Sequence, residues 1–441
     1  MRVDKAQAHY LANHVEAEVA HLQQLRLQHY NHSLVVPAHR EILDDINNIW
    51  VHKDPGLLII LVINSWDLLD EVSINLLTSL QHDASATSAN LFLVPQIKAP
   101  DLLVVNRCTP DRLLPRERGV GLARKIGADL ALALIDRATI ASHWIHSTDA
   151  DVTLPADYFD LPAPGKDDAA VVRSFQHRFS PGLELASRLY DIAMHYYVLG
   201  LRWTGSQHSH HSIGSTLSIS ARHYARVRGF PRRNAGEDFY LLNKLVKSGH
   251  VSTLGRFDVQ PAQTGSVIIV DARHSDRAPF GTGAALQTIS DLTTPITQYS
   301  YYDPRIFALL RTFTQQAKQA LQTGELLSRT PADCFADSPL IQRWLTDTKL
   351  DQKILQQRSR STEPHVLQRF MTDWFDGFQT LKFIHYMRDA YYPSRCLDDI
   401  CDGSLMPDMT IDDIDSVRQL HQRLNSKLDE GSGAANSTRR Q

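Results

Sequence analysis

The sequence predicts an α/β fold: a mostly parallel β-sheet flanked by helices, followed by a helical C-terminal region. Short apolar runs rich in Val, Ile and Leu alternate with segments whose apolar residues recur at helical spacing. Continuous apolar strands between helices are typical of parallel sheets covered on both faces. From about residue 284 onward the chain is mostly helical in pattern and polar. A length of 441 residues is enough for two or three domains of about 150 residues each.

The elements are expected in the following order. Residues 1–32 carry Leu11, Val15, Val19, Leu22 and Leu25 at helical spacing, which predicts an amphipathic helix. The next segments are predicted as a strand at 34–36 stopped by Pro37, a helix at 41–51, strands at 57–63, 91–94 and 102–105, a helix at 121–134 and a strand ending at Thr148. A strand at 169–173 and a helix at 183–201 continue the alternation.

Composition excludes several classes of protein. The formal net charge is −3, from 46 Lys and Arg against 49 Asp and Glu, so we expect no nucleic-acid partner. The four cysteines are scattered and form no CxxC, and the N-terminus lacks the apolar core of a signal peptide, which together favour a cytoplasmic location. The longest apolar run, 57–63, is far shorter than the about 20 residues of a membrane span. Peripheral contact with a membrane surface stays open.

Polar clusters follow three of the predicted strands. They lie at 37–41, 64–67 and 149–151. Ligands of open α/β sheets bind outside the carboxyl ends of the strands, so these clusters are expected to converge at one edge. In the last cluster Asp149 and Asp151 are two residues apart, and in an extended backbone their side chains point the same way. Two carboxylates can hold a divalent cation such as Mg²⁺ and leave positions open for phosphates; a solvated turn is the simpler interpretation of this pair alone.

Four motifs in this order give the sequence a more specific resemblance. They are Leu34-Val-Val-Pro-Ala-His-Arg-Glu41, Asn64-Ser-Trp-Asp67, Asp149-Ala-Asp151 and Gly236-Glu-Asp-Phe-Tyr-Leu-Leu-Asn-Lys-Leu245. Together they resemble the GT-A nucleotide-sugar glycosyltransferases, in particular the family-2-like group. The resemblance implies a GT-A-type sheet over about 33–270. It also implies transfer of a sugar from a nucleoside-diphosphate donor to an unidentified acceptor hydroxyl, with Mg²⁺ or Mn²⁺ as cofactor.

The resemblance divides the chain into four parts. An N-terminal helix at 1–32 precedes a glycosyltransferase domain at 33–283, which binds the nucleotide with about 33–151 and the acceptor with about 152–283. A helical region at 284–428 follows, and the small, polar segment 429–441 is expected to be disordered. The C-terminal helices have no chemistry that the sequence reveals, and they are a candidate surface for homo-oligomers.

The resemblance also assigns the donor site. Pro37, His39 and Glu41 would lie near the nucleoside, although Glu41 can equally favour the start of the following helix. Asn64 and Asp67 stand where the family carries base-reading acidic residues; an amide both donates and accepts, so the base stays undetermined.

The segment Gly119-Val-Gly-Leu-Ala-Arg-Lys-Ile-Gly127 stands before the Asp-x-Asp. There the glycines and Arg124 or Lys125 are expected to approach a phosphate.

Catalysis is assigned to the helix that Gly236 opens. The resemblance makes Asp238 the general base that takes the proton of the acceptor hydroxyl in an inverting reaction, with Glu237 in support. Acidic capping of the helix is the purely structural alternative. If the reaction proceeds with retention, Asp238 would instead orient the acceptor.

Two further segments are candidates for the site. In Arg273-His-Ser-Asp-Arg277, His274 would complete the metal site with Asp149 and Asp151, and Arg273 and Arg277 would neutralise the leaving diphosphate; an ordinary surface loop is the alternative. Gln207-His-Ser-His-His211 has the composition of a transition-metal site, but a flexible acceptor-side loop is the favoured interpretation.

Two other functions fit parts of the pattern. A nucleotidyltransferase that makes nucleotide sugars also uses a doubly wound sheet and a metal carboxylate, but it needs a glycine-rich loop after the first strand, where residues 37–41 contain no glycine. A non-catalytic scaffold or binding protein on a GT-A frame is the second alternative, against which the intact Asp149, Asp151 and Asp238 argue.

Overall fold

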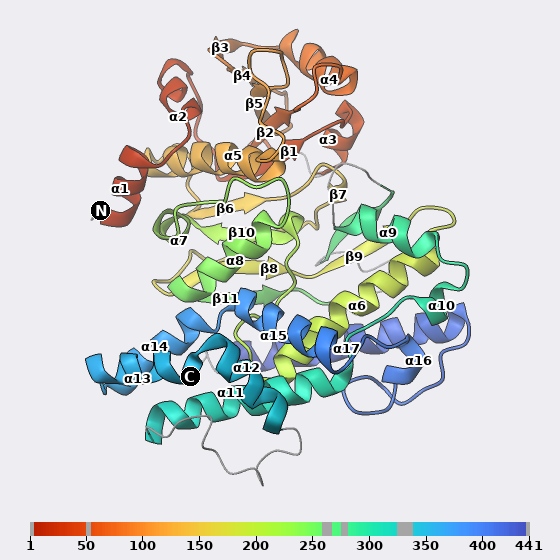
Figure 1. The fold of residues 1–441 in the computed structure, drawn as a ribbon. Coiled ribbons are helices and arrows are strands. Elements are labelled where there is room, and N and C mark those ends of the chain that lie inside the picture. The colour runs from red at the N-terminus through yellow and green to blue at the C-terminus, as the bar shows by residue number, and fades with distance from the viewer. Residues whose placement is uncertain (1–3, 50–53, 258–266, 275–280, 324–337, 438–441) are drawn as a thin grey trace. The chain divides into compact units, whose positions relative to one another are not determined.

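A large mixed β-sheet confirms the predicted α/β class, and a helical region follows it along the chain (Figure 1). The computed structural model describes residues 4–49, 54–257, 267–274, 281–323 and 338–437. Compactness divides the chain into two units, described separately below. The first comprises Met1–Glu184, Ser212–Gln287 and Asp429–Gln441, and the second comprises Leu185–His211 and Thr288–Leu428.

The sheet of the first unit has nine strands in the order β11-β8-β10-β6-β1-β2-β5-β4-β3. Its parallel centre consists of β1 (His32–Ala38), β2 (Leu57–Asn64), β5 (Asp101–Arg107) and β6 (Trp144–Ser147). The other strands are β3 (Ala86–Ser88), β4 (Leu91–Val94), β8 (Asp168–Arg173), β10 (Leu217–Ser220) and β11 (His250–Leu254); β10 runs antiparallel to both of its neighbours, and β4 to β5 and β3. A smaller sheet joins β7 (Val152–Thr153), β12 (Ile268–Ala272) and β9 (Phe175–Phe179).

The strand order reverses at β1. From β1 the chain moves outward through β2 to β5, and α5 (Gly119–Asp136) then returns it to β6 on the other side of β1. Such a reversal leaves a crevice outside the carboxyl ends of the two strands, because their connections leave in opposite directions. The segments that follow β1 and β6 therefore border this crevice.

Pro37 does not stop the first strand as expected. It lies inside β1 in register with Val62 of β2, and the strand continues to Ala38. On the opposite side, the carbonyl of Val35 accepts the amide hydrogen of Thr148 just past the end of β6. Because alternate residues of a strand bond to the same neighbour, the missing N–H of Pro37 faces a place where β6 has already ended.

Helix α5 packs closely on the central strands because one of its residues is a glycine. A Cβ on Gly127 would collide with Cγ1 of Val35 in β1.

The predicted N-terminal helix is divided into α1 (Lys5–Asn13), α2 (Glu18–His21) and a 3-10 turn (Leu22–Gln24). Lys125 of α5 donates to Tyr10 at 2.5 Å and to Asp129 at 2.8 Å, so its side chain ties α1 to α5 instead of pointing toward a phosphate. The remaining helices of the first unit are α3 (Leu43–Ile49), α4 (Glu71–Gln81), α7 (Ala221–Arg226) and α8 (Glu237–Ser248), and α9 (Thr282–Ser290) crosses its boundary.

The second unit is helical. It contains α10 (Pro295–Gln298), α11 (Pro304–Thr323), α12 (Ser338–Thr348), α13 (Leu350–Arg360), α14 (Pro364–Trp374), α15 (Gly377–Ala390), α16 (Leu397–Ile400) and most of α17 (Ile414–Ser437). It also takes α6 (Glu184–Trp203), which the sequence places between strands of the α/β domain. Tyr196 of α6 explains this assignment, since its hydroxyl donates to the Tyr302 carbonyl at 2.9 Å and its ring meets Phe307 at 5.4 Å.

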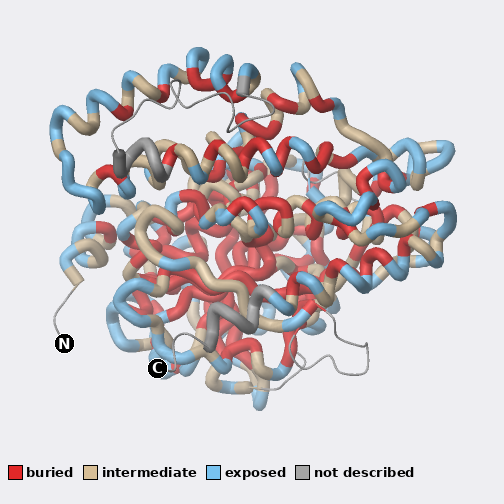
Figure 2. Tube along the Cα trace, turned by 90° about the horizontal axis from the view of Figure 1, so that it is seen from below, coloured by how far each residue is buried: buried red, intermediate tan, exposed pale blue. Residues whose placement is uncertain are grey.

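The distribution of buried and exposed residues agrees with these elements. Figure 2 shows buried residues along the strands and on one side of many helices, with exposed residues on the outer turns. The backbone of α17 is helical to Ser437, into the segment for which disorder is predicted. None of the described helices combines the length and the apolar character that a bilayer crossing requires.

Candidate functional site

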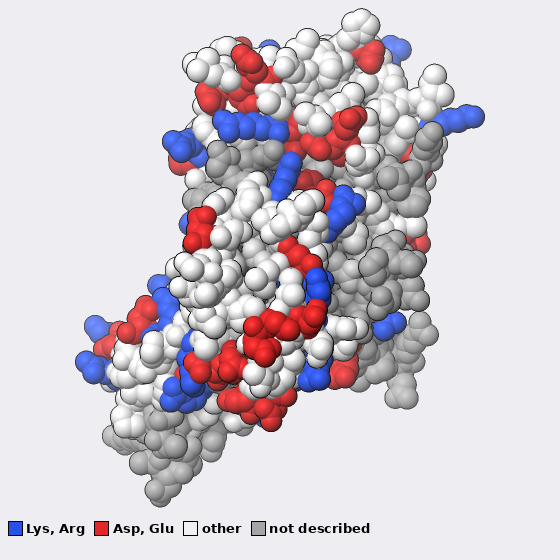
Figure 3. Space-filling model, turned by 90° about the vertical axis from the view of Figure 1, so that its right-hand side faces the viewer, with Lys and Arg blue, Asp and Glu red and all other residues white. Residues whose placement is uncertain are grey.

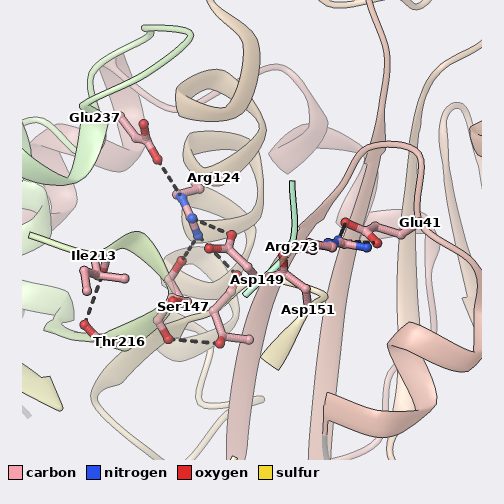
Figure 4. A network of polar contacts seen from close by, with 11 residues as sticks. Glu41, Arg124, Ser147, Asp149, Asp151, Ile213, Thr216, Glu237 and Arg273 are labelled. Atoms are coloured by element: carbon pink, nitrogen blue, oxygen red, sulfur yellow. Dashed lines mark hydrogen bonds and ion pairs between the residues drawn. The ribbon is translucent and has the colours of Figure 1, made fainter. Parts of the chain in front are cut away.

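Charged side chains from five segments of the first unit that are far apart in sequence lie close together (Figure 4). They follow β1, β6 and β12 or open α8, and one further residue comes from α5. Figure 4 shows two groups, one around Arg124 and one around Arg273, on either side of Asp149 and Asp151.

Arg124 connects three of these segments. Its side chain is 3% exposed. Nε donates to Glu237 Oε1 at 2.9 Å, and Nη2 donates to Asp149 Oδ1 at 2.5 Å. Nη1 donates to Ser147 Oγ at 3.0 Å and to the Thr148 carbonyl at 3.1 Å. Burial lowers the pKa of this guanidinium, but Asp149 and Glu237 outweigh burial and hold the pKa above its ordinary value.

The contacts of Arg124 are with protein acceptors, and the expected contact with a phosphate stays a prediction. The guanidinium is buried and directed at protein acceptors, so it fixes the Asp149 and Glu237 carboxylates. The glycines before it also serve packing. A Cβ on Gly121 would lie 2.5 Å from the Arg233 carbonyl oxygen, and the Gly121 amide donates to the same oxygen at 2.8 Å.

Gly214 makes room for the guanidinium. It opens the 3-10 turn Gly214–Thr216 before β10, and a Cβ at this position would lie 2.8 Å from Cζ of Arg124. The turn is held in place because Thr148 Oγ1 donates to the Ser215 carbonyl at 2.9 Å and Thr216 Oγ1 to the Ile213 carbonyl at 3.0 Å. No local sequence pattern marks Gly214, Ser147 or Thr148 for these roles.

Asp238 has the electrostatics of a base that works near neutral pH. Burial and the neighbouring Glu237 carboxylate raise its pKa to about 7, while the Phe239 amide and Arg124 oppose the shift. The amide of Phe239 donates to Asp238 Oδ1 at 2.7 Å. The helix begins here because Gly236 adopts a left-handed conformation, φ 69°, which only glycine takes without cost. Glu237 is committed to Arg124, so the two predicted catalytic carboxylates have different partners.

Arg273 joins Glu41 to Asp151. Its Nη2 lies 2.9 and 3.0 Å from the two Glu41 carboxylate oxygens and 3.2 Å from Asp151 Oδ2. The Glu41 side chain is 6% exposed, whereas that of Asp151 is 28% exposed. Burial lowers the pKa of Arg273, but Asp151 and Glu41 raise it above its ordinary value. Glu41 therefore pairs with the Arg273 guanidinium, so favouring the start of the following helix is not its only role.

The charges of the two groups do not balance. With Asp238 ionised, five carboxylates (Glu41, Asp149, Asp151, Glu237 and Asp238) accompany two guanidiniums (Arg124 and Arg273), which leaves three negative charges in excess. Excess carboxylate at a solvent-accessible edge suits a hard divalent cation such as Mg²⁺ or Mn²⁺. Asp149 and Asp151, whose side chains are 34% and 28% exposed, are the residues that would hold it.

A third protein ligand is not apparent in the described part of the chain. No group of three or more His, Cys, Asp or Glu residues converges there as a metal site. His274, the expected third ligand, is exposed at the end of β12, and Arg277 lies outside the described residues. A cation on Asp149 and Asp151 would then complete its shell with water or substrate oxygens.

The expected nucleoside side of the site lies at the ends of β1 and β2. His39 contacts the Asn64 carbonyl at 2.9 Å through Nδ1, and its ring lies 4.2 Å from that of Trp66. Asn64 is 2% exposed, and its Oδ1 has no hydrogen-bond partner among the described residues. Asp67 accepts from the Leu69 amide at 2.9 Å and lies 3.7 Å from Arg40. These contacts bring Pro37, His39, Asn64 and Asp67 to adjacent strand ends, and they add Trp66, which the sequence analysis left out.

The histidine-rich segment 207–211 belongs elsewhere. The segment forms a loop, as expected, but it lies in the helical unit, and His208, His210 and His211 are buried at 9%, 8% and 4% exposed. Burial lowers the pKa of His210 and His211 to about 3, and His211 Nε2 lies 3.0 Å from His195 Nδ1. His210 and His211 are therefore packed as neutral core groups.

Charges elsewhere on the protein are mixed. Figure 3 shows acidic and basic side chains interspersed over the described residues of one face, in keeping with the near-neutral net charge.

Comparison with known proteins does not identify a family: no protein-family model matches the chain, and no curated sequence is significantly similar to it.

Proposed function

We propose that this chain is a metal-dependent glycosyltransferase of the GT-A type, which moves a sugar from a nucleoside-diphosphate donor to an acceptor hydroxyl. One observation carries the proposal. Where the strand order reverses, the partly exposed carboxylates Asp149 and Asp151 follow β6, and burial together with the carboxylates of Glu237 and Asp149 raises the pKa of Asp238 to about 7. Ligands of open α/β sheets bind at such a reversal.

Asp238 supplies the base. A carboxylate with a pKa near the working pH takes up a proton effectively and is still ionised in a useful fraction of molecules. Asp238 would accept the proton of the acceptor hydroxyl as its oxygen bonds to the anomeric carbon and the bond from that carbon to the diphosphate oxygen breaks. The products are the glycoside, a nucleoside diphosphate and protonated Asp238. A single displacement of this kind inverts the anomeric configuration.

The other charged residues prepare this step. Arg124 fixes Glu237 and Asp149, so that the base-bearing turn of α8 and the end of β6 keep a constant separation. Arg273 offers a guanidinium at the same edge, suited to the developing charge of a diphosphate. When bound by Asp149 and Asp151, a divalent cation would supply further neutralisation of the leaving diphosphate.

The nucleotide would lie toward the ends of β1 and β2. Trp66 and His39 provide aromatic surface there, and the Asn64 amide provides both donor and acceptor. Because an amide complements several bases equally well, this arrangement favours a nucleotide without naming its base.

A thermal-shift panel tests the donor site. UDP-, GDP-, ADP- and dTDP-sugars are compared with and without Mn²⁺ on the wild type, on Asp151→Ala and on Asp83→Ala, a control carboxylate just past α4 whose side chain is 71% exposed and lies 3.1 Å from His82. A ligand at about 100 times its dissociation constant adds about 2.7 kcal/mol to the free energy of unfolding. We expect one donor to stabilise the wild type and the control only with Mn²⁺, and not Asp151→Ala.

The products test the reaction class. Release of a nucleoside diphosphate from the stabilising donor is expected for glycosyl transfer or slow hydrolysis. Release of pyrophosphate from a nucleoside triphosphate and a sugar phosphate would show nucleotidyl transfer instead. Absence of a shift with every donor would contradict the proposed function.

A further inference from the structure

The helical unit contains a pocket that the proposed function does not use. It lies between the loop after α6, one face of α11, the end of α14 and the start of α15. Its lining comprises Thr204, Gly205, Ser206, Gln207, His208, Leu310, Phe313, Thr314, Ala317, Met371, Thr372, Phe375 and Thr380. The residues from α11 follow helical spacing, so a single face of that helix forms one wall.

The size of the pocket suits one small ring. Its void is about 110 Å³ and opens to solvent on one side. An engineered apolar cavity of about 150 Å³ in another protein binds benzene. Gly205 leaves the rim open, because a Cβ at this position would meet no atom within 4 Å. A ring could therefore enter and leave part of its substituents in the solvent.

The floor of the pocket is apolar and aromatic. Phe313 is 1% exposed, and its ring lies 4.8 Å from that of Phe375 at an interplanar angle of 62°. Trp344 supports Phe313 from behind at 5.0 Å. Leu310, Ala317 and Met371 complete this surface. Rigid aromatic walls favour the face or edge of another ring over a flexible chain, since their geometry is fixed.

The four threonine hydroxyls of the pocket are hydrogen-bond acceptors, whereas Ser206, Gln207 and His208 of the rim can also donate. Four threonine hydroxyls already donate to carbonyls of their own helix or its end: Thr204 to Leu201 at 2.7 Å, Thr314 to Leu310 at 2.8 Å, Thr372 to Gln368 at 3.1 Å and Thr380 to Asp376 at 2.9 Å. A hydroxyl has one hydrogen and two lone pairs, so these groups retain only acceptor capacity. A ligand that bonds to these threonines must bring the hydrogen-bond donor.

The lining carries no Asp, Glu, Lys or Arg among its described residues. Transfer of an isolated charge into such surroundings is strongly unfavourable. A carboxylate or an ammonium is thus a poor occupant, whereas a hydroxyl can donate to a threonine and accept from solvent or from Ser206.

We propose that this pocket binds an uncharged alcohol built on a six-membered ring, with an apolar ring face against Phe313 and Phe375 and a hydroxyl toward the threonines. Two sources share this chemistry, an aryl alcohol and a neutral sugar ring. The proposal is independent of the glycosyltransferase function and concerns the helical unit alone.

Methyl NMR of the full chain labelled at methionine methyl groups tests the site. Met371 lines the pocket, while Met387 and Met406 are fully buried elsewhere and act as internal references. The probes are benzyl alcohol and methyl β-glucoside, with toluene, benzoate and benzylammonium for comparison. We expect a saturable shift of the Met371 signal with at least one ring alcohol; the probe that binds more tightly identifies the source. Both charged probes should bind about tenfold more weakly or worse.

Variants of α11 locate the binding. Thr314→Leu fills the pocket and should weaken ring-alcohol binding by about tenfold or more. Thr312→Leu is the matched control, because Thr312 lies on the same helix and donates to its own backbone at 3.0 Å without lining the pocket. Thr372→Val, which removes one acceptor, should weaken benzyl alcohol more than toluene.

Three results would overturn the proposal. They are the absence of a saturable Met371 shift with both ring alcohols, equal affinity in Thr314→Leu and Thr312→Leu, and binding of benzoate or benzylammonium as tight as that of benzyl alcohol. Because Thr314 and Thr372 are only partly buried, at least one of the two variants should fold and keep the test decisive.

Discussion

Gly214 lies against the guanidinium of Arg124 so closely that a side chain at this position would press on it. A Cβ on Gly214 would approach Cζ at 2.8 Å and Nε at 3.1 Å. Since Arg124 in turn holds Glu237 and Asp149, the absence of one side chain before β10 determines where two carboxylates of the site lie.

Replacement of Gly214 by alanine should therefore disturb the site from a distance. Overpacking of a buried position costs about 1–3 kcal/mol, and we expect Gly214→Ala to lower the free energy of unfolding by this amount and to weaken Mn²⁺-dependent donor binding. Chemical denaturation and the thermal-shift panel measure the two effects. In an Arg124→Ala background the same substitution should cost clearly less, because the clashing group is gone; fully additive costs would contradict the proposed clash.

Asp238→Asn should abolish the base without removing the donor site. General-base catalysis contributes about 10²–10⁴-fold in rate, so turnover should fall by this factor while donor binding stays. In the wild type, kcat/KM should rise with pH and level off above an apparent pKa near 7, the value at which Asp238 loses its proton. Unchanged turnover in Asp238→Asn would remove this assignment and leave Asp238 an orienting role.

The same carboxyl group predicts how stability depends on pH. Its folded-state pKa of about 7 lies above the value of about 3.9 for an unfolded aspartate. The folded state thus binds the proton more tightly, and this contribution to stability is complete below about pH 4 and lost as the pH rises through about 7. Asn does not titrate. As the pH rises through this window, the wild type should lose stability while Asp238→Asn does not. At pH 8 the melting temperature of Asp238→Asn should therefore be higher than that of the wild type by about 2–4 °C or more.

Arg273 should compete with a divalent cation for Asp151. Its guanidinium lies 3.2 Å from Asp151 Oδ2, so a cation bound there must share or displace this contact. Arg273→Gln removes one positive charge from the site, and we expect Mn²⁺ to bind several-fold more tightly, as measured by electron paramagnetic resonance of the free ion. Arg222→Gln is the control, since Arg222 of α7 pairs with Asp4 of the N-terminal segment at 2.6 Å. Equal or weaker Mn²⁺ affinity in Arg273→Gln would show that the arginine and the ion do not compete.

The sequence anticipates much of the sheet but less of the site. The strand predicted at 91–94 coincides with β4, and that at 57–63 is one residue shorter than β2, because continuous apolar runs between polar turns are a strong local signal. The same patterns indicate that Glu41, Asn64 and Asp149 follow strands. They miss the continuation of β1 through Pro37, which depends on where the neighbouring strand ends.

What the sequence alone determines is therefore the α/β class, the order of its main strands and helices, and the placement of polar residues at strand ends. Only the tertiary structure shows which charged residues contact each other. Arg124 meets Glu237, 113 residues away, and Arg273 meets Glu41, 232 residues away. It also transfers α6 to the helical unit and gives Gly121, Gly127 and Gly214 packing roles. Local hydrophobic periodicity reflects which face of an element is buried; which other element covers that face, and which charges meet there, depends on contacts between residues distant in the chain.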